Sequence, residues 1–505
     1  MSKIESFKET ITNGYACKGD YITLGGAMFE GQPVENVLVN LPLKTLNRHG
    51  LIAGATGTGK TKTLQVIAEN LSKNGVPVLL MDLKGDLSGL ASAGEEKSFI
   101  TERHKKIGLS FEPQDFPVEL LTISEQKGAR MRATVSEFGS VLLSRILDLT
   151  DVQEGVLAVV FKYCDDHGYP LLDLKDLKKI LQFATEEGKA DFEKEYGAIA
   201  KTSTSAILRK IVELEHQGAE LFFGERSFEP QDLLRRDKNG NGFVNIIRLT
   251  DIQDRPKMFS TFMLSLLAEI YSTFPEEGDL QKPKLVIFID EAHLIFSEAS
   301  KTLLNQLENI VKLIRSKGVG LIFCTQNPTD VPDAVLSQLG MKVQHALRAF
   351  TAKDRKAIKL TAENYPISEF YNTTEVLTSL GTGEAFVTVL NEKGIPTPLV
   401  ATMLRAPMSR MDILSDAEIQ NLVNNSELVR KYNEVIDRES AYELLNKKIA
   451  EINNQAEAQK EQPSKQRQAS QTTKRSTAQN PLLKMVTSAT FIRGVFGVLS
   501  KVMKK

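Results

Sequence analysis

The sequence predicts an α/β fold in which helices cover both faces of a mainly parallel sheet. Continuous apolar runs occupy residues 76–82 (VPVLLMD), 284–290 (KLVIFID) and 319–325 (VGLIFCT), with helical patterns between them. Such runs are typical of strands buried on both faces, as in parallel sheets. A glycine-rich segment at 54–59 also follows a short apolar run directly and precedes a helical pattern. Together these observations favour an open sheet built from alternating strands and helices.

The other elements of the predicted core share short apolar stretches bounded by turn residues. Strands are predicted at residues 49–55, 117–123, 242–249, 341–347, 383–390 and 397–404. Helices are predicted at residues 60–74, 257–274 and 299–317. The glycine-rich segment therefore joins a predicted strand to a predicted helix.

The length of 505 residues predicts two or three units rather than one core. Residues 1–46 are predicted to be a short β-rich N-terminal segment, and 47–125 with 238–405 form the α/β core. Residues 126–237 are rich in Leu, Lys, Glu and Asp at helical spacing, which predicts an inserted helical subdomain. Residues 406–458 have the pattern of polar helices and are predicted to be a helical extension.

The C-terminal tail differs in composition from the rest of the chain. Residues 459–480 contain almost no apolar side chain, which predicts a disordered basic linker, and 481–505 have the apolar stripe of an amphipathic helix. Lys460–Lys505 holds ten Lys or Arg and one acid, so this tail is +9 and the rest of the chain is −10, for a net charge of −1. The tail could contact nucleic acid, a membrane surface or an acidic partner, or it could be a solvated arm or pack back on the body.

Residues 54–61, GATGTGKT, match the pattern G-x-x-x-x-G-K-[ST] at every fixed position. Glycines let successive backbone N–H groups point at phosphate oxygens, and the following helix adds its positive end. Lys60 would place an ammonium group at the outer phosphates, and Thr61 would give its hydroxyl to Mg²⁺. The predicted cofactors are ATP and Mg²⁺. The predicted nucleotide-binding residues are Gly54, Ala55, Thr56, Gly57, Thr58, Gly59, Lys60, Thr61 and Lys62.

Asp290 and Glu291 follow a predicted buried strand, whose carboxyl end faces the ligand edge of the sheet. We expect Asp290 to hold Mg²⁺ through water and Glu291 to act as general base. The alternative is that the two acids are the acidic first residues of a helix without a catalytic role. Gln326 follows the run at 319–325 and could sense the terminal phosphate, or it could belong to a strand-end turn. Asp82 ends another strand and could join this polar network or cap a loop.

A terminal phosphate needs positive charge as its bond breaks, and a neighbouring subunit often supplies it. Arg315 and Arg348 are the candidates for this role, and for each a surface ion pair is the alternative. His49 and His293 lie near the motifs without other metal ligands at suitable spacing, so we interpret both as structural residues.

Five segments resemble HerA-like ATPases of the FtsK–HerA branch. They are NRHGLIAGATGTGKT (47–61), LLMDLKGDLSGL (79–90), LVIFIDEAHLIF (285–296), LIRSKGVGLIFCTQNPTDVPDAVLSQLG (313–340) and HALRAFTAKD (345–354). The resemblance covers most of residues 10–410. It implies a P-loop NTPase fold of the additional-strand, catalytic-Glu type, with Glu291 as base and Gln326 as sensor. It also implies a homohexameric ring with the nucleotide sites at subunit interfaces. DNA translocases of this branch thread duplex DNA through such a ring.

Two readings of the function differ in the substrate that is moved. The resemblance and the basic tail favour a ring ATPase that translocates or remodels double-stranded DNA. The near-zero net charge and the amphipathic last helix favour an ATPase acting on a protein or a membrane-associated partner. An ATP-gated scaffold is a third reading, disfavoured by the Asp290–Glu291 pair because binding alone needs no base. The polar N-terminus and the lack of an apolar run of about 20 residues lead us to expect a cytoplasmic protein.

Overall fold

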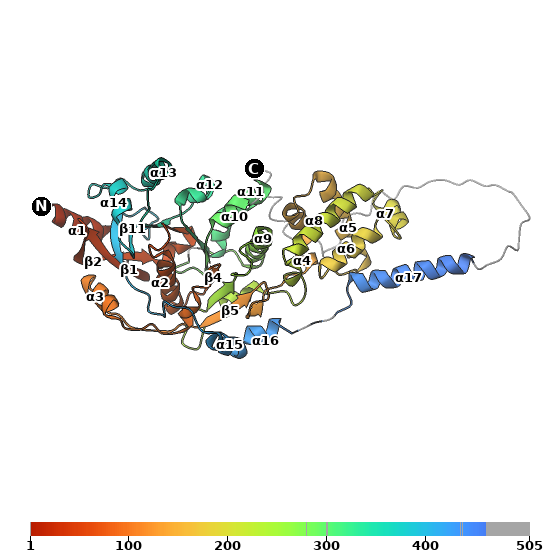
Figure 1. Cartoon of the computed structure of the whole chain (residues 1–505), viewed down its shortest axis with the longest axis horizontal. Helices are drawn as coiled ribbons and strands as arrows, with labels where there is room; N and C mark the ends of the chain where they lie inside the picture. The colour runs from red at the N-terminus through yellow and green to blue at the C-terminus, as the bar shows by residue number, and fades with distance from the viewer. Residues whose placement is uncertain (1, 279, 299–300, 435, 437, 461–505) are drawn as a thin grey trace, which may run out of the picture. The chain divides into compact units, whose positions relative to one another are not determined.

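The computed structural model describes residues 2–460 except 279, 299–300, 435 and 437. Its elements belong to two compact units (Figure 1). The first unit takes the described residues of 1–132, 217–222 and 226–435, and the second those of 133–216, 223–225 and 436–460. The predicted linker and amphipathic helix of the tail lie outside the described residues, apart from the first two residues of that linker.

The first unit is built on one twelve-stranded sheet with the order β2-β1-β12-β11-β10-β3-β9-β8-β4-β7-β5-β6. The strands are β1 (Tyr21–Phe29), β2 (Gln32–Pro42), β3 (Gly50–Ala53), β4 (Val78–Asp82), β5 (Val118–Thr122), β6 (Ala129–Arg130), β7 (Val244–Arg248), β8 (Leu285–Ile289), β9 (Val319–Thr325), β10 (Met341–His345), β11 (Glu384–Thr388) and β12 (Val400–Leu404).

The strands from β10 to β6 in this order pair in parallel, and β11, β12, β1 and β2 pair antiparallel. Every residue of β3, β4, β5, β8 and β9 is buried, as expected for strands covered on both faces. The prediction of a mainly parallel α/β sheet is therefore confirmed, and each predicted strand overlaps an observed one.

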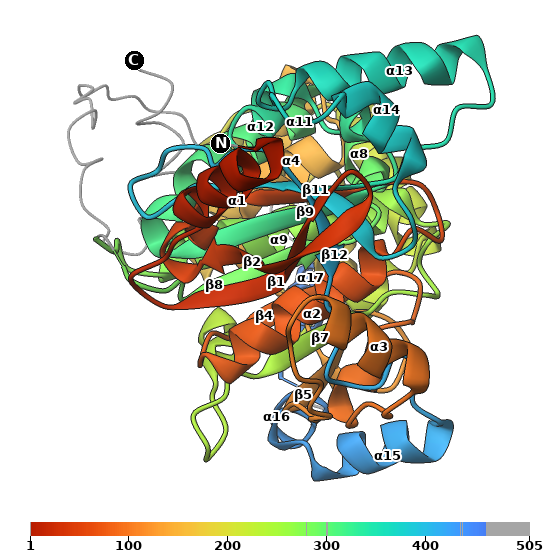
Figure 2. The ribbon, with the colours of Figure 1, turned by 90° about the vertical axis from the view of Figure 1, so that its left-hand side faces the viewer.

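Helices form a layer on each side of this sheet. In Figure 2, α11 (Lys301–Ile314), α12 (Asp333–Leu336) and α13 (Ala352–Glu363) lie above β1 and β9, and α2 (Lys60–Lys73) and α3 (Ser98–Lys106) lie below β1. The other helices of this unit are α1 (Lys3–Gly14), α9 (Pro256–Thr273), α10 (His293–Glu298), α14 (Thr373–Ser379), α15 (Asp416–Asn425) and α16 (Glu427–Tyr432), with short 3₁₀ turns η1 (Leu43–Arg48), η2 (Ser88–Ala91), η3 (Ala219–Leu221), η4 (Pro230–Leu234), η5 (Arg315–Lys317) and η6 (Pro328–Asp330).

The N-terminal segment extends the main sheet. β1 pairs with β12, with Gly26 opposite Met403, and with β2 on its other side. Residues 21–42 are therefore part of the same layer as the core strands, whereas the sequence suggested a separate β-rich segment. The pairing joins residues almost 380 positions apart, which no local pattern indicates.

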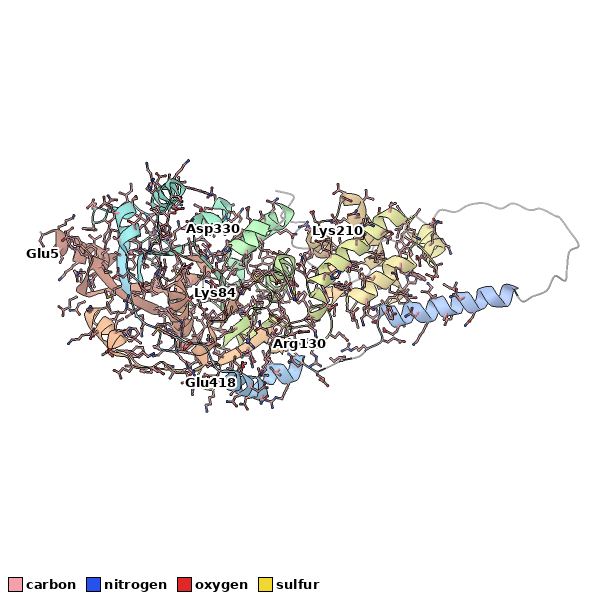
Figure 3. All side chains as sticks on the ribbon, in the orientation of Figure 1. Glu5, Lys84, Arg130, Lys210, Asp330 and Glu418 are labelled. Carbon is pink, nitrogen blue, oxygen red and sulfur yellow. The ribbon has the colours of Figure 1, made fainter. Side chains whose placement is uncertain are left out.

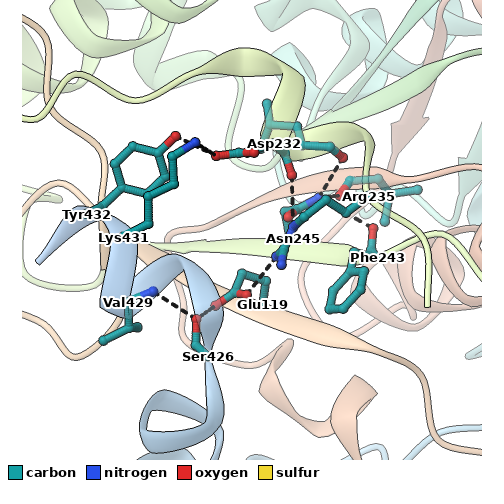
Figure 4. A network of polar contacts seen from close by, with 11 residues as sticks. Glu119, Asp232, Arg235, Phe243, Asn245, Ser426, Val429, Lys431 and Tyr432 are labelled. Atoms are coloured by element: carbon teal, nitrogen blue, oxygen red, sulfur yellow. Dashed lines mark hydrogen bonds and ion pairs between the residues drawn. The ribbon is translucent and has the colours of Figure 1, made fainter. Parts of the chain in front are cut away.

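A polar network attaches α16 to the sheet (Figure 4). Glu119 of β5 accepts a hydrogen bond from Ser426 Oγ at 2.5 Å and pairs with Arg235 Nη2 at 2.7 Å. Asp232 accepts from Lys431 Nζ at 2.8 Å. These contacts connect the segment after the last strand to β5 and η4, so α15 and α16 are integral to the first unit.

The second unit is a helical bundle. It contains α4 (Val135–Ile146), α5 (Asp151–His167), α6 (Leu174–Phe183), α7 (Lys189–Glu195), α8 (Lys201–His216) and α17 (Ala441–Lys460). Tyr163 stacks on Phe192 with ring centroids 4.2 Å apart, and Lys448 of α17 donates to the Tyr163 hydroxyl at 2.9 Å. A helix from the predicted extension thus completes the helical insertion. In the described part of the chain, no helix has the length and apolar character needed to cross a bilayer.

Candidate functional site

The GATGTGKT loop connects β3 to α2, as the sequence predicts. Gly57 has φ +77° and Gly59 has φ +112°, which are left-handed conformations that disfavour side chains. A Cβ atom on Gly57 would have no neighbour within 4 Å, so its backbone conformation is what requires glycine there. Thr56 and Gly57 are exposed, and the loop therefore opens to solvent at its top.

Lys60 begins α2 and folds its side chain into its own loop. Its Nζ donates to the carbonyl oxygens of Gly54 at 2.6 Å and Ala55 at 3.1 Å. Burial lowers the pKa of Lys60, the nearby charge of Lys84 lowers it further, and the charges of Glu291 and Asp290 oppose both effects. The ammonium group is thus held inside the loop, where phosphate oxygens could replace the two carbonyls.

Asp290 and Glu291 follow β8, at the same sheet edge as the glycine-rich loop. Both side chains are buried, and burial raises the pKa of Asp290 to about 6. Glu291 has φ +47°, an uncommon conformation for a residue with a side chain. Its buried carboxylate oxygen Oε2 has no hydrogen-bond partner in the part of the chain that the structure describes, and His293 Nδ1 lies 3.2 Å from it. His293 thus lies beside Glu291, and its interpretation as a structural residue stays a prediction.

Lys84 is a charged residue of this site that the sequence analysis missed. Its Nζ forms an ion pair with Glu291 Oε1 and lies 3.9 Å from Asp290 Oδ2. It comes from the loop after β4, and Figure 3 labels it near the middle of the first unit. Lys84 lies within the segment LLMDLKGDLSGL, which the sequence analysis noted for its family resemblance. The loop after β4 reaches Asp290 and Glu291 only because β4 pairs with β8.

Asp82 fixes the loop that carries Lys84. Its carboxylate accepts hydrogen bonds from the backbone N–H groups of Gly85 at 2.7 Å and of Asp86 and Leu87 at 3.2 Å. Burial raises the pKa of Asp82 to about 6. These contacts match the interpretation of Asp82 as a residue that caps a loop. Because the capped loop carries Lys84, Asp82 also determines where Lys84 lies.

Gln326 directly follows β9, the strand between β3 and β8 in the sheet, and its side chain is exposed. The turn behind it is held by Asp330, labelled in Figure 3, which accepts from Thr325 Oγ1 at 2.7 Å and from the Asn327 N–H at 3.1 Å. Gln326 is therefore at the correct edge, and its role as a sensor stays a prediction.

The two candidate arginines lie at opposite edges of the sheet. Arg315 is in η5, before β9, and its charge contributes to lowering the pKa of the buried His49. Arg348 follows β10 at the edge of the glycine-rich loop, is exposed, and donates from Nη1 to the Thr378 carbonyl at 3.3 Å. The roles of both arginines stay predictions.

Three further residues complete the surroundings of the loop. His49 accepts from the Leu321 N–H at 3.0 Å and contacts the Val311 carbonyl at 2.7 Å, consistent with its structural interpretation. His345, which the sequence analysis did not single out, lies under the loop with Nε2 2.8 Å from Thr63 Oγ1. Lys62 donates to the Met411 carbonyl at 2.6 Å, so its predicted nucleotide contact requires its main chain or another rotamer.

Comparison with known proteins identifies the family of the chain. The family described as Helicase HerA-like C-terminal matches residues 29–498. The chain belongs to this HerA-like family. Two relatives are DNA double-strand break repair helicases HerA. The protein of Sulfurisphaera tokodaii is 27% identical over 358 residues, covering 70% of this chain and 64% of the relative. That of Sulfolobus acidocaldarius is 23% identical over 396 residues, covering 75% and 69%. The HerA-like chain thus spans about two thirds of the length of these relatives.

The fold of this HerA-like protein is also found in a solved coupling protein. The bacterial conjugative coupling protein TrwB has a TM-score of 0.52 and 16% identity, covering 81% of this chain and 95% of that one. A second TrwB structure, in complex with ADP and Mg²⁺, has a TM-score of 0.51 and 16% identity, covering 80% and 94%. These similarities confirm the predicted P-loop NTPase fold for the HerA-like chain.

The residues present fit a nucleotide with Mg²⁺. The loop offers an open backbone cradle and an ammonium bound only to carbonyls, and the opposite side offers a buried carboxylate, Asp290. No group of three or more His, Cys, Asp or Glu side chains among the described residues could hold a metal. Mg²⁺ commonly uses one or two carboxylates together with substrate phosphates, so the predicted ligands Thr61 and Asp290 would be a sufficient protein contribution.

Proposed function

We propose that this HerA-like protein binds Mg-ATP at the loop 54–61 and hydrolyses it with Glu291 as general base. The observation that carries the proposal is the gathering of Lys60, Asp290 and Glu291 at one sheet edge, where the charges of both acids act on Lys60. Open α/β sheets bind ligands at the carboxyl ends of their strands. The HerA-like relatives named as helicases support the same activity.

Each residue has a distinct task in the proposed reaction. Lys60 would exchange its loop carbonyls for phosphate oxygens, and the backbone N–H groups of 57–61 would orient the same phosphates. Glu291 would take a proton from water as the water oxygen bonds to the terminal phosphorus and the bond to the bridging oxygen breaks. Bound Mg²⁺, held by Thr61 and Asp290, would supply charge neutralisation on the phosphates. Gln326 would orient the attacking water or sense the terminal phosphate.

Two substitutions test this assignment. Lys60→Ala should weaken ATP binding about 10- to 100-fold, because this is the affinity that the free energy of a charge-assisted hydrogen bond corresponds to. Glu291→Gln should bind ATP at least as tightly as the unsubstituted chain and lower turnover about 10²- to 10⁴-fold, because it removes the base and keeps the side-chain shape. Nucleotide affinity by calorimetry and phosphate release measure the two effects. Unchanged affinity in Lys60→Ala would contradict the site, and unchanged turnover in Glu291→Gln would contradict the base and favour a scaffold.

We further propose that ATP hydrolysis is coupled to translocation or remodelling of double-stranded DNA by a homohexameric ring in the cytoplasm. The names of the HerA relatives support DNA as substrate, and so does the DNA import protein CedB of Sulfolobus acidocaldarius, 22% identical over 389 residues, covering 75% of this chain and 56% of that one. ATP turnover with and without duplex DNA at several salt concentrations tests the coupling, because phosphate contacts make binding salt-dependent. A mass measurement with nucleotide tests the ring. An ATP turnover rate that duplex DNA leaves unchanged at low salt would favour a protein or membrane-associated substrate.

A further inference from the structure

Lys84 lies against the two carboxylates that follow β8. Its ammonium group pairs with Glu291 Oε1 and lies 3.9 Å from Asp290 Oδ2. The Lys84 side chain is 39% exposed, whereas those of Asp290 and Glu291 are 8% and 10% exposed. Lys84 is therefore the solvent-facing member of the group and covers the two acids.

The loop of Lys84 is fixed at its base and free to turn its side chain. Asp82 holds the backbone of residues 85–87 through three N–H groups, which anchors the loop next to β8. Among the described residues, the Lys84 ammonium pairs with these two acids and donates no hydrogen bond to the backbone. A side chain held only by charge on an anchored loop can change partner without moving the main chain.

The charges around Lys84 favour an anion as an alternative partner to the two acids. The charge of Lys84 lowers the pKa of Lys60, so the two ammonium groups are close enough to repel each other. A terminal phosphate bound at Lys60 would lie within the same electrostatic neighbourhood and offer oxygens that carry more negative charge than one carboxylate. Ammonium groups bind phosphate as strongly charged donors.

We propose that Lys84 is a positioning residue that is shared between Glu291 and the terminal phosphate of a nucleoside triphosphate. Without triphosphate, the Lys84 ammonium occupies Oε1 of Glu291, one of the two carboxylate oxygens that could accept a proton from water. With triphosphate, Lys84 transfers to the phosphate and releases Glu291 to accept the proton from water. The inference rests on the proposed function, and it makes the release of the base depend on the terminal phosphate, which a diphosphate lacks.

A double-mutant cycle on nucleotide affinity tests the sharing. The probes are a non-hydrolysable ATP analogue and ADP, each with Mg²⁺, titrated against the full chain. Glu291→Gln frees Lys84 and should tighten analogue binding about tenfold while leaving ADP binding nearly unchanged, a factor of ten being about 1.4 kcal/mol. In the Lys84→Met background, the same Glu291→Gln substitution should leave analogue affinity unchanged. Lys84→Arg keeps the charge and should restore most of the coupling between the two positions.

Lys282→Met is a matched control. Lys282 precedes β8 at the other edge of the sheet, pairs with Asp20 at 2.8 Å and has an exposed fraction of 36%, close to that of Lys84. It should alter no nucleotide affinity. Equal tightening by Glu291→Gln with and without Lys84→Met would overturn the sharing, since simple removal of a negative charge would then explain it. If the unsubstituted chain binds neither nucleotide, the proposed function itself fails, and that outcome is distinct from uncoupled affinities.

Discussion

His49 shows how one buried side chain can join the strand before the glycine-rich loop to its neighbours. It accepts from the N–H of Leu321 in β9 and contacts the carbonyl of Val311 in α11. The two contacts require one ring nitrogen to accept and the other to donate, which only the neutral imidazole can do. Burial lowers the pKa of His49 to about 4, and the charge of Arg315 contributes in the same direction.

The stability of the first unit should therefore depend on pH through His49. Between about pH 6.5 and 4 the unfolded chain binds a proton at this residue and the folded protein does not, so acidification lowers the free energy of unfolding. His49→Gln removes this pH-dependent contribution to the free energy of unfolding. The difference in unfolding free energy between the unsubstituted chain and His49→Gln should be about 2 kcal/mol smaller at pH 5 than at pH 7.5. Denaturant titrations at the two pH values measure it, and a pH-independent difference would contradict the neutral buried histidine.

The limits of the sequence analysis are clearest at Lys84 and Asp290. Asp290 was predictable because it ends a continuous apolar strand, and a residue in that position reaches the ligand edge of a parallel sheet. Lys84 was not predictable as a site residue, because its contact with Glu291 arises from the non-local pairing of β4 with β8. The spacing between the two loops in the sequence is about 200 residues and carries no information on strand order.

At the scale of elements, the buried strands were recognised individually, whereas β1 and β2 were expected only as part of a short β-rich segment. β3, β4, β8 and β9 are fully buried, so their apolar runs are continuous and stand out from the sequence. In β2, by contrast, buried and exposed positions are interleaved irregularly, and its partner β1 joins β12 through the antiparallel side of the sheet. Long-range antiparallel pairing of this kind has no local sequence signature.

The attachment of α16 gives a stability prediction for an element. Glu119 has a side chain only 5% exposed and is shared by Arg235 and Ser426. Glu119→Ala leaves the Arg235 guanidinium without its carboxylate partner, and breaking a buried pair in this way costs about 3 kcal/mol or more. We expect a lower unfolding free energy of the first unit and faster proteolysis within residues 415–432.

An exposed ion pair provides the control for Glu119→Ala. Lys189 and Glu193 are one helical turn apart on α7 with 3.7 Å between Nζ and Oε1, and both side chains are largely exposed. Exposed pairs contribute little to stability, so Glu193→Gln should leave unfolding and proteolysis unchanged. Equal effects of the two substitutions would show that the Glu119 network does not anchor α16.

At the scale of the whole molecule, the edge that carries the glycine-rich loop also presents features of an interaction surface. Arg348 is exposed there, and Phe350, two residues later, is 86% exposed. Aromatic and arginine side chains are enriched where proteins meet. Arg315 lies at the opposite edge beside the elements that hold His49. If sites form between subunits, this arrangement favours Arg348 over Arg315 as the residue that completes the site of a neighbour.

Mixing two variants tests whether Arg348 acts across a subunit interface. Arg348→Ala should bind ATP normally and lose turnover about 10³-fold or more, as for other arginines that act on a neighbour's phosphate. Glu291→Gln loses turnover for a different reason, and it still presents an intact Arg348. In a closed ring of randomly mixed subunits, about one quarter of the interfaces combine an intact base with an intact arginine. Phosphate release by the mixture should therefore rise well above that of either variant. Arg315→Ala, measured in parallel, should keep its turnover. A mixture no more active than its components would mean that Arg348 does not act across an interface.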